Sequence, residues 1–353
     1  RIYQDILRRF PANKKAKIGL KAVSGNPTGK FQKILDPPAD QQQLLINLYN
    51  QGQLQQALDQ AKGLLEQFPH SILLHNICGA VYAAFKQYDA AIDSYKQALK
   101  IKPDYAEAFN NMGVALKDKG ELDAAIDSFK QALKIKSNYA EAHNNLGIAL
   151  WEQGELDAAI DSYKKALKIK PDYAEVHSNL GSALQDKGEL DAAIDSFKQA
   201  LKIKPDFAEA HYNIGNGLKD RGDLDAAIDS YKQALKIKPD YAEAHNNMGN
   251  ALQDKGELDA AIESCKQALK IKSDYAAAHY NIGNALKDKG ELDAAIDSYK
   301  QALKIKPGYA EAHNNMGVSL QNKGELDAAI DSYKQALKIK PDYVSAKSQM
   351  LHQ

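Results

Sequence analysis

Residues 106–139 read AEAFNNMGVALKDKGELDAAIDSFKQALKIKSNY, and most of the chain consists of close copies of this stretch of 34 residues. Eight tandem copies fill residues 72–343, and they begin at Ile72, Ala106, Ala140, Ala174, Ala208, Ala242, Ala276 and Ala310. A period of this length is typical of a stacked array, in which each unit buries its apolar face against its neighbours. Positions 1 to 34 below refer to the place of a residue within its copy.

Each copy has the pattern of two helices joined by a turn. Apolar residues recur at three- and four-residue steps before and after Gly120, which predicts one amphipathic helix on either side of it. Glycine there can end the first helix in a left-handed conformation. Asp104 and Glu107 predict a capping box at the start of the first helix, Asp123 predicts a cap for the second, and Pro171 ends a second helix. The predicted fold is all-α, an α-solenoid of helix-turn-helix hairpins.

Small residues recur where two helices must approach closely. Position 8 is glycine in seven successive copies, positions 20 and 27 are alanine, position 32 is mostly proline, and position 24 is aromatic in every full copy except at Cys265. In these features the copies resemble tetratricopeptide repeats, although position 4, usually aromatic in that family, is mostly histidine here. The resemblance implies a right-handed superhelix whose first helices line a concave groove.

The register weakens outside the eight copies. Residues 1–22 have the pattern of a partial repeat of two helices, and residues 23–37 that of a turn-rich linker. Residues 38–71 form a degenerate copy expected to cap the array, and residues 344–353 begin a further helix. Because both ends interrupt a repeat, we expect the intact protein to be longer.

Composition limits the classes of partner. Lys plus Arg and Asp plus Glu are equal at 46 each, so no bulk charge favours nucleic acid or an anionic membrane. No apolar run is long enough to span a bilayer, and no secretory signal is visible, so the expected location is cytoplasmic. Cys78 and Cys265 lie more than five copies apart, which argues against a disulfide or a shared zinc ion.

The histidines at position 4 do not predict a metal site. Packed helices lie about 8 to 10 Å apart, whereas the ligands of one zinc ion lie about 2 Å from it. We therefore expect half-buried rings that replace the aromatic residue of the family. No Ser/His/Asp, Cys/His or phosphate-loop pattern is present, so the sequence predicts no catalytic site, no metal, no cofactor and no enzyme activity.

Asparagine occupies position 6 in seven successive copies, on the side of the first helix that should face away from the second helices. We call these residues the Asn row: Asn111, Asn145, Asn179, Asn213, Asn247, Asn281 and Asn315. Asparagine is a poor helix former, so helix stability alone does not favour such a row, and alanine there should raise stability. An amide can hold the N–H and C=O groups of a peptide whatever its side chains. Copying during duplication is the alternative explanation of the row.

The Asn row is similar to the asparagine ladder that lines the superhelix of O-linked N-acetylglucosamine transferases and grips extended peptides; their catalytic domain has no counterpart here. The predicted groove also includes Tyr212 and Tyr280, which replace asparagine at position 5, and Trp151, an aromatic at an otherwise polar position and hence a candidate contact anchor. The predicted function is a non-enzymatic scaffold that binds extended peptide or protein segments.

Two alternatives remain open from the sequence. Half-repeats at both ends could stack head to tail into a filament, because a heterologous interface that does not close makes open polymers. The chain could also be the recognition arm of a glycosyltransferase whose catalytic domain lies outside it, which rests on family analogy alone. None of the three hypotheses includes nucleic acid or a membrane as a partner.

Overall fold

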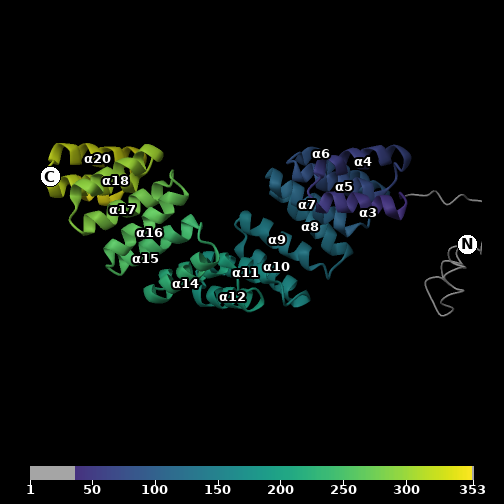
Figure 1. Cartoon of the computed structure of the whole chain (residues 1–353), viewed down its shortest axis with the longest axis horizontal. Helices are drawn as coiled ribbons and strands as arrows, with labels where there is room; N and C mark the ends of the chain where they lie inside the picture. Colours follow the sequence, from purple (N-terminus) through teal and green to yellow (C-terminus); the bar gives the residue numbers. More distant parts are fainter. Residues whose placement is uncertain (1–35, 352–353) are drawn as a thin grey trace, which may run out of the picture. The chain divides into compact units, whose positions relative to one another are not determined.

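The computed structural model describes residues 36–351, which form nineteen α-helices and no strand (Figure 1). The prediction of an all-α chain of helical hairpins is confirmed. The partial repeat predicted at residues 1–22, nearly all of the linker predicted at 23–37, and the last two residues of the segment predicted at 344–353 lie outside the described residues.

The chain divides into two compact units, Arg1–Ala108 and Phe109–Gln353. The described part of the first unit contains α3 (Ala39–Asn50), α4 (Leu54–Gln67), α5 (Ile72–Ala84) and α6 (Tyr88–Ile101). Helix α7 (Ala106–Lys119) begins three residues before the boundary. The remaining helices are α8 (Leu122–Ile135), α9 (Ala140–Glu152), α10 (Leu156–Ile169), α11 (Ala174–Asp186), α12 (Leu190–Ile203), α13 (Ala208–Asp220), α14 (Leu224–Ile237), α15 (Ala242–Asp254), α16 (Leu258–Ile271), α17 (Ala276–Asp288), α18 (Leu292–Ile305), α19 (Ala310–Lys323), α20 (Leu326–Ile339) and α21 (Val344–Leu351).

Within the second unit each hairpin packs on the next through a regular set of helix contacts. The two helices of a hairpin contact each other, as in α13 and α14, and the second helix then contacts the first helix of the following hairpin, as in α14 and α15. Successive first helices also touch, from α9 to α19, whereas successive second helices have no comparable contact within residues 109–351. The first helices therefore lie on the inner side of the stack, and we call their solvent side the inner face.

Glycine at position 8 lets the aromatic ring at position 24 lie directly on the backbone of the first helix. A Cβ atom added to Gly181 would lie 2.7 Å from Cε1 of Phe197, and one added to Gly215 would lie 2.5 Å from Cε1 of Tyr231. Both rings are fully buried. The close approach predicted for this glycine is confirmed, and it anchors each hairpin.

The helix ends agree with the sequence only in part. The turn glycines have left-handed conformations, such as Gly154 with φ 88°, as predicted. From α9 onward the capping boxes do not form, because α9 begins at an N-cap Tyr139 that makes no side-chain cap bond, and the later first helices likewise have aromatic N-caps. The acidic or amide residue that was expected to cap each of these helices lies one position before the N-cap. The cap predicted at Asp123 is also wrong, since Glu121 is the N-cap of α8 and Asp123 lies in its first turn.

Packing explains why an aromatic residue takes the N-cap position. The ring of Tyr241, the N-cap of α15, lies with its centroid 4.9 Å from that of Tyr212, and the ammonium group of Lys238 lies 4.5 Å from the centre of the Tyr241 ring. Aromatic contacts of this kind contribute about 0.5–1.5 kcal/mol beyond area burial, which matches what a polar cap provides.

Lys86 occupies the turn position that is glycine in the seven following copies. Its φ of 58° makes it the one non-glycine residue with positive φ between residues 36 and 351. Because a side chain in this region of backbone space is strained, we expect Lys86→Gly to raise the free energy of unfolding by about 0.5–1 kcal/mol. Urea denaturation of the full chain measures this. Lower stability of the variant would contradict the expectation, and Gly154→Lys should show the reverse change.

Candidate functional site

The Asn row lies along the inner face, on the first helices α7, α9, α11, α13, α15, α17 and α19. Its members are half-buried, except for Asn281, which is 7% exposed. The structure thus places the predicted residues in one line on successive hairpins. What each amide has left for a ligand depends on its hydrogen bonds within the chain.

Three members of the row donate a hydrogen bond to an asparagine at position 5 of the preceding first helix. Each bond joins Nδ2 to Oδ1 at 3.0 Å, and the pairs are Asn145 with Asn110, Asn179 with Asn144 and Asn281 with Asn246. We call these bonds between positions 6 and 5 the amide ladder. Each uses one of the two N–H groups of the donor, so a second N–H group of Asn145 and Asn179 remains.

Asn247 is held more completely, because tyrosine replaces asparagine at position 5 before it. Its Nδ2 donates to the hydroxyl oxygen of Tyr212 at 2.9 Å and to Oδ1 of Asn216 at 3.0 Å. The hydroxyl of Tyr231 donates to the same Oδ1 at 2.8 Å, and Oδ1 of Asn247 accepts from Asn246. Both donor directions of Asn247 and one acceptor direction are therefore used inside the protein.

The same arrangement recurs two hairpins later. Nδ2 of Asn315 donates to the hydroxyl of Tyr280 at 3.0 Å and to Oδ1 of Asn284 at 2.9 Å, and Tyr299 donates to Asn284 at 2.8 Å. Oδ1 of Asn315 accepts from Asn314. We call these two clusters the Tyr212 station and the Tyr280 station. At each of them, the N–H groups of the Asn-row member are used inside the protein.

Asn213 makes no side-chain hydrogen bond with any residue that the structure describes, and its half-buried amide keeps all of its donors and acceptors. The reason lies in the preceding first helix, where position 5 is Ser178, whose side chain is too short to meet the amide. From Asn145 to Asn315 the Asn row therefore has two kinds of member, five that join hairpins and one, Asn213, that does not. A repeat alignment alone shows Ser178, but not this effect.

The structure also changes the interpretation of Trp151. The indole is partly buried against the main core cluster, and its Nε1 donates to Oδ2 of Asp186 at 2.7 Å. Other residues at position 12 make the same link to position 13 of the next copy, as Gln253 does with Asp288 at 2.7 Å. Trp151 thus joins two hairpins through its N–H group, and it can offer a ligand only the surface of its ring.

The histidines at position 4 hold the loop between hairpins. Nε2 of His177 donates to the carbonyl oxygen of Pro171 at 2.9 Å, and four other histidines at position 4 make the equivalent bond. Burial lowers the pKa of His143, His211, His245, His279 and His313. The prediction of half-buried rings is confirmed. Among residues 36–351, no group of three or more His, Cys, Asp or Glu side chains could hold a metal ion.

Ion pairs across hairpins were not foreseen from the sequence. Position 14 reaches back to the aspartate at position 18 of the preceding hairpin, as in Lys187 with Asp157 at 2.8 Å and Arg221 with Asp191 at 2.7 Å. These pairs lie in solvent, where each contributes less than about 1 kcal/mol. In each pair the cation partly neutralises the charge of the aspartate at position 18.

Tyr163 provides a test of the core next to the site. Its hydroxyl is buried without a partner, because Ile148 and Trp151 occupy the positions that supply an acceptor to Tyr231 and Tyr333 in their own copies. We expect Tyr163→Phe to raise the free energy of unfolding by about 1 kcal/mol, since an unpaired polar group is removed. Tyr231→Phe, which breaks a bond, should lower it by about 0.5–1.5 kcal/mol. Thermal denaturation of both variants measures the difference, and equal effects would contradict it.

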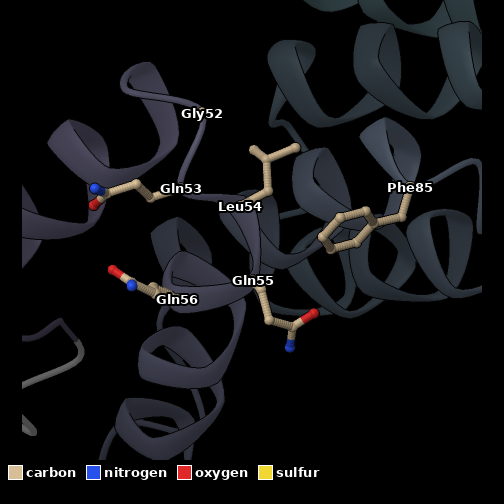
Figure 2. A pocket seen from close by; sticks show the side chains of 6 residues that line it. All are labelled: Gly52, Gln53, Leu54, Gln55, Gln56 and Phe85. Atoms are coloured by element: carbon tan, nitrogen blue, oxygen red, sulfur yellow. The ribbon is translucent and has the colours of Figure 1, made fainter.

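A pocket of about 390 Å³ lies in the first unit, away from every predicted site residue. It is lined by Gly52, Gln53, Leu54, Gln55, Gln56 and Phe85 (Figure 2). Figure 2 shows the side chains of Gln53 and Gln56 directed away from Phe85. No charged side chain lines it, so the pocket offers amides and one exposed ring but no acid, base or nucleophile.

A search of residues 36–351 for a helix of the length and apolar character that a bilayer requires found none.

Comparison with known proteins gives one clear family signal. A family model described as "TPR repeat" matches residues 79–120, 115–154, 152–188, 182–219, 215–256, 249–290 and 283–324, and one described as "Tetratricopeptide repeat" matches residues 310–343. A curated Arabidopsis thaliana protein, "Probable UDP-N-acetylglucosamine--peptide N-acetylglucosaminyltransferase SEC", is 34% identical over 76 residues. That match covers 22% of this chain and only 8% of the Arabidopsis protein.

Two solved structures share the arrangement of helices. The APC/C hetero-tetramer Cut9–Hcn1 matches with a TM-score of 0.58 at 18% identity, over 85% of this chain and 58% of that one. The pilF protein of Pseudomonas aeruginosa matches with a TM-score of 0.53 at 18% identity, over 61% of this chain and 97% of that one. At this identity the similarity supports the fold alone.

Proposed function

Because the chain belongs to the tetratricopeptide repeat family, we propose that it is a non-enzymatic scaffold whose inner face binds an extended peptide or protein segment. The proposal concerns the second unit, where the first helices α9 to α19 lie side by side. Family membership supports binding of a protein segment in general terms. The location and manner of binding rest on the side chains of the inner face.

One observation carries the proposal: three consecutive members of the Asn row keep hydrogen-bonding groups that the chain does not use. Asn145 and Asn179 each keep one N–H group, and Asn213 keeps its whole amide. All three are half-buried, so they are oriented and still reach solvent. An amide in this state can donate to and accept from a peptide main chain, whatever its side chains.

The spacing of these amides suits an extended ligand. Neighbouring helices lie about 10 Å apart, and an extended peptide rises about 3.3 Å per residue, so successive hairpins meet about every third residue. Asn145 and Asn213, two hairpins apart, would then meet main-chain groups that face the same way, and Asn179 would lie opposite the middle of a segment of about seven residues. The ring of Trp151, in the same helix as Asn145, would add an apolar contact at one end. The rest of the Asn row, with Tyr212 and Tyr280, would extend the same face in both directions.

The test uses Asn213→Ala and two twelve-residue peptides that share a main chain and differ in their side chains. One alternates lysine and alanine, and the other alternates serine and alanine. We expect both peptides to bind the variant about 2- to 12-fold more weakly, since one net hydrogen bond is worth about 0.5–1.5 kcal/mol. Stability should not fall, because the side chain of Asn213 makes no hydrogen bond with any of residues 36–351 and alanine is the better helix former. Isothermal titration and thermal denaturation measure the two quantities.

Two results would contradict the proposal. One is that neither peptide binds the intact chain. The other is that Asn213→Ala binds both peptides unchanged, which would leave copying by duplication as the explanation of the row. A weaker affinity for only one of the peptides would instead indicate recognition of side chains, and the main-chain mode of binding would then be wrong.

A further inference from the structure

A second period, of two hairpins, is superimposed on the first. The copies that begin at Ala208 and Ala276 share tyrosine at position 5, isoleucine at 7, asparagine at 9 and lysine at 12. The copies that follow them, at Ala242 and Ala310, instead share asparagine at position 5, methionine at 7 and glutamine at 12. Positions 5 and 12 lie on the inner face, so its chemistry alternates from one hairpin to the next.

The two tyrosine hydroxyls have the same environment. The ring of Tyr212 lies 6.0 Å from that of Tyr231 and 4.9 Å from that of Tyr241, and Tyr280 repeats these distances with Tyr299 and Tyr309. Each oxygen accepts from an asparagine of the next first helix. Neither hydroxyl donates a hydrogen bond within residues 36–351, although the side chain of Asn216 also contacts the hydroxyl of Tyr212. Each half-buried phenol is thus held in place with one unused donor.

An extended ligand explains why such donors recur at every second hairpin. Successive residues of an extended chain point to opposite faces, so groups an odd number of residues apart face opposite ways and groups an even number apart face the same way. One hairpin corresponds to about three residues, and two hairpins, about 20 Å, correspond to about six. Only every second hairpin therefore meets the same face of the ligand.

We propose that Tyr212 and Tyr280 form two equivalent stations, which donate their hydroxyl hydrogens to main-chain carbonyl oxygens six residues apart in one bound segment. This inference rests on the proposed function and adds its register: the bound segment spans at least seven residues and lies extended without a bulge between the stations. Asn281, which follows Tyr280 in α17, is buried and donates to Asn246, so it contributes to the frame and not to the ligand.

Charge guides the choice of probe. The exposed carboxylates of Glu209, Glu243, Asp220 and Asp254 outnumber Lys219, the one Lys or Arg on the two first helices that form the Tyr212 station. The charge of Glu243 adds to the effect of burial in raising the pKa of Tyr212, which keeps the phenol protonated. Lysine-containing peptides therefore suit this part of the inner face, and the probes are acetylated and amidated peptides of alternating lysine and alanine, five and twelve residues long.

Isothermal titration with these two peptides tests the stations. The five-residue peptide is too short to reach both, so Tyr212→Phe and Tyr280→Phe should each remove one of its binding sites. The twelve-residue peptide should occupy both at once, and either substitution should weaken it about tenfold or more, because linked sites gain affinity from effective concentration. Tyr231→Phe is the matched control: it removes a hydroxyl of the same network on its core side and should leave the stoichiometry unchanged.

The outcomes separate this inference from the proposed function. If the twelve-residue peptide binds and is weakened by Asn213→Ala but by neither tyrosine variant, the stations are wrong and the binding face stands. If Tyr231→Phe alters binding as much as Tyr212→Phe does, the network has only a structural role, which also overturns the stations. Thermal denaturation of each variant confirms that it is folded before it is titrated.

Discussion

Gly215→Ala is expected to lower the free energy of unfolding by about 1–3 kcal/mol, although alanine is the better helix former by about 1 kcal/mol. The added Cβ atom would lie 2.5 Å from Cε1 and 2.7 Å from Cδ1 of Tyr231. That ring is fully buried and its hydroxyl is bonded to Asn216, so it cannot move aside without breaking further contacts. Urea denaturation followed by circular dichroism measures the loss.

Gly217→Ala, two residues along the same helix, is the matched control and should change stability in the opposite direction. Its Cβ atom would lie 3.2 Å from Cγ1 of Ile194, a contact that a small side-chain shift relieves. The corresponding position is alanine in five other copies of the array, for example Ala183 and Ala251, both fully buried. We expect a gain of about 0.5–1 kcal/mol. If both glycines tolerate alanine equally, close packing against the position-24 ring does not stabilise the hairpin.

Asn247→Ala is expected to lower the free energy of unfolding by about 1–3 kcal/mol. The substitution removes two donated hydrogen bonds, to Tyr212 and Asn216, and one accepted from Asn246. Each is worth about 0.5–1.5 kcal/mol, and the gain in helix propensity offsets only several tenths of a kcal/mol. Urea denaturation of this variant beside Asn213→Ala measures the contrast, because the two residues share one repeat position and differ in their bonds.

Unchanged stability of Asn247→Ala would contradict a role for the amide ladder in joining hairpins. The ladder also revises the expectation, drawn from helix propensity, that alanine anywhere in the Asn row raises stability. That expectation now applies to Asn213 alone among the members whose bonds are described above. At Asn145 and Asn179 the lost bond to the preceding helix should outweigh it.

The sequence was sufficient for the fold because its periods are long and nearly free of exceptions. Apolar spacing located both helices of each copy, and the turn glycines located the ends of the first helices, as Gly154 confirms. The starts of the helices were predicted wrongly, because an aspartate before a helix suggests a polar cap. The competing demand came from a contact distant in sequence, the ring of Tyr241 against Tyr212.

The site was predictable as a line of residues, but not as a set of hydrogen bonds. Position 6 in the repeat gives a place on the inner face, and that can be read from one copy. Whether an amide there is free depends on position 5 of the copy before it, 35 residues away, as for Asn179 and Asn144. Distances between hairpins decide that such side chains meet, and a sequence period carries no distances.

The amide ladder bears on how an array of this kind can change in length during evolution. Each bond joins position 6 of one copy to position 5 of the copy before it. After 34 residues are added or deleted, an asparagine at position 6 therefore faces position 5 of a different copy, which in most copies carries a residue that can accept the bond. Loss of residues 174–207, for instance, would bring Asn213 behind Asn144 and supply the acceptor that Ser178 does not. The bonds that hold the copies together thus tolerate recombination between copies, and this deletion would use part of the one amide that keeps all of its hydrogen-bonding groups.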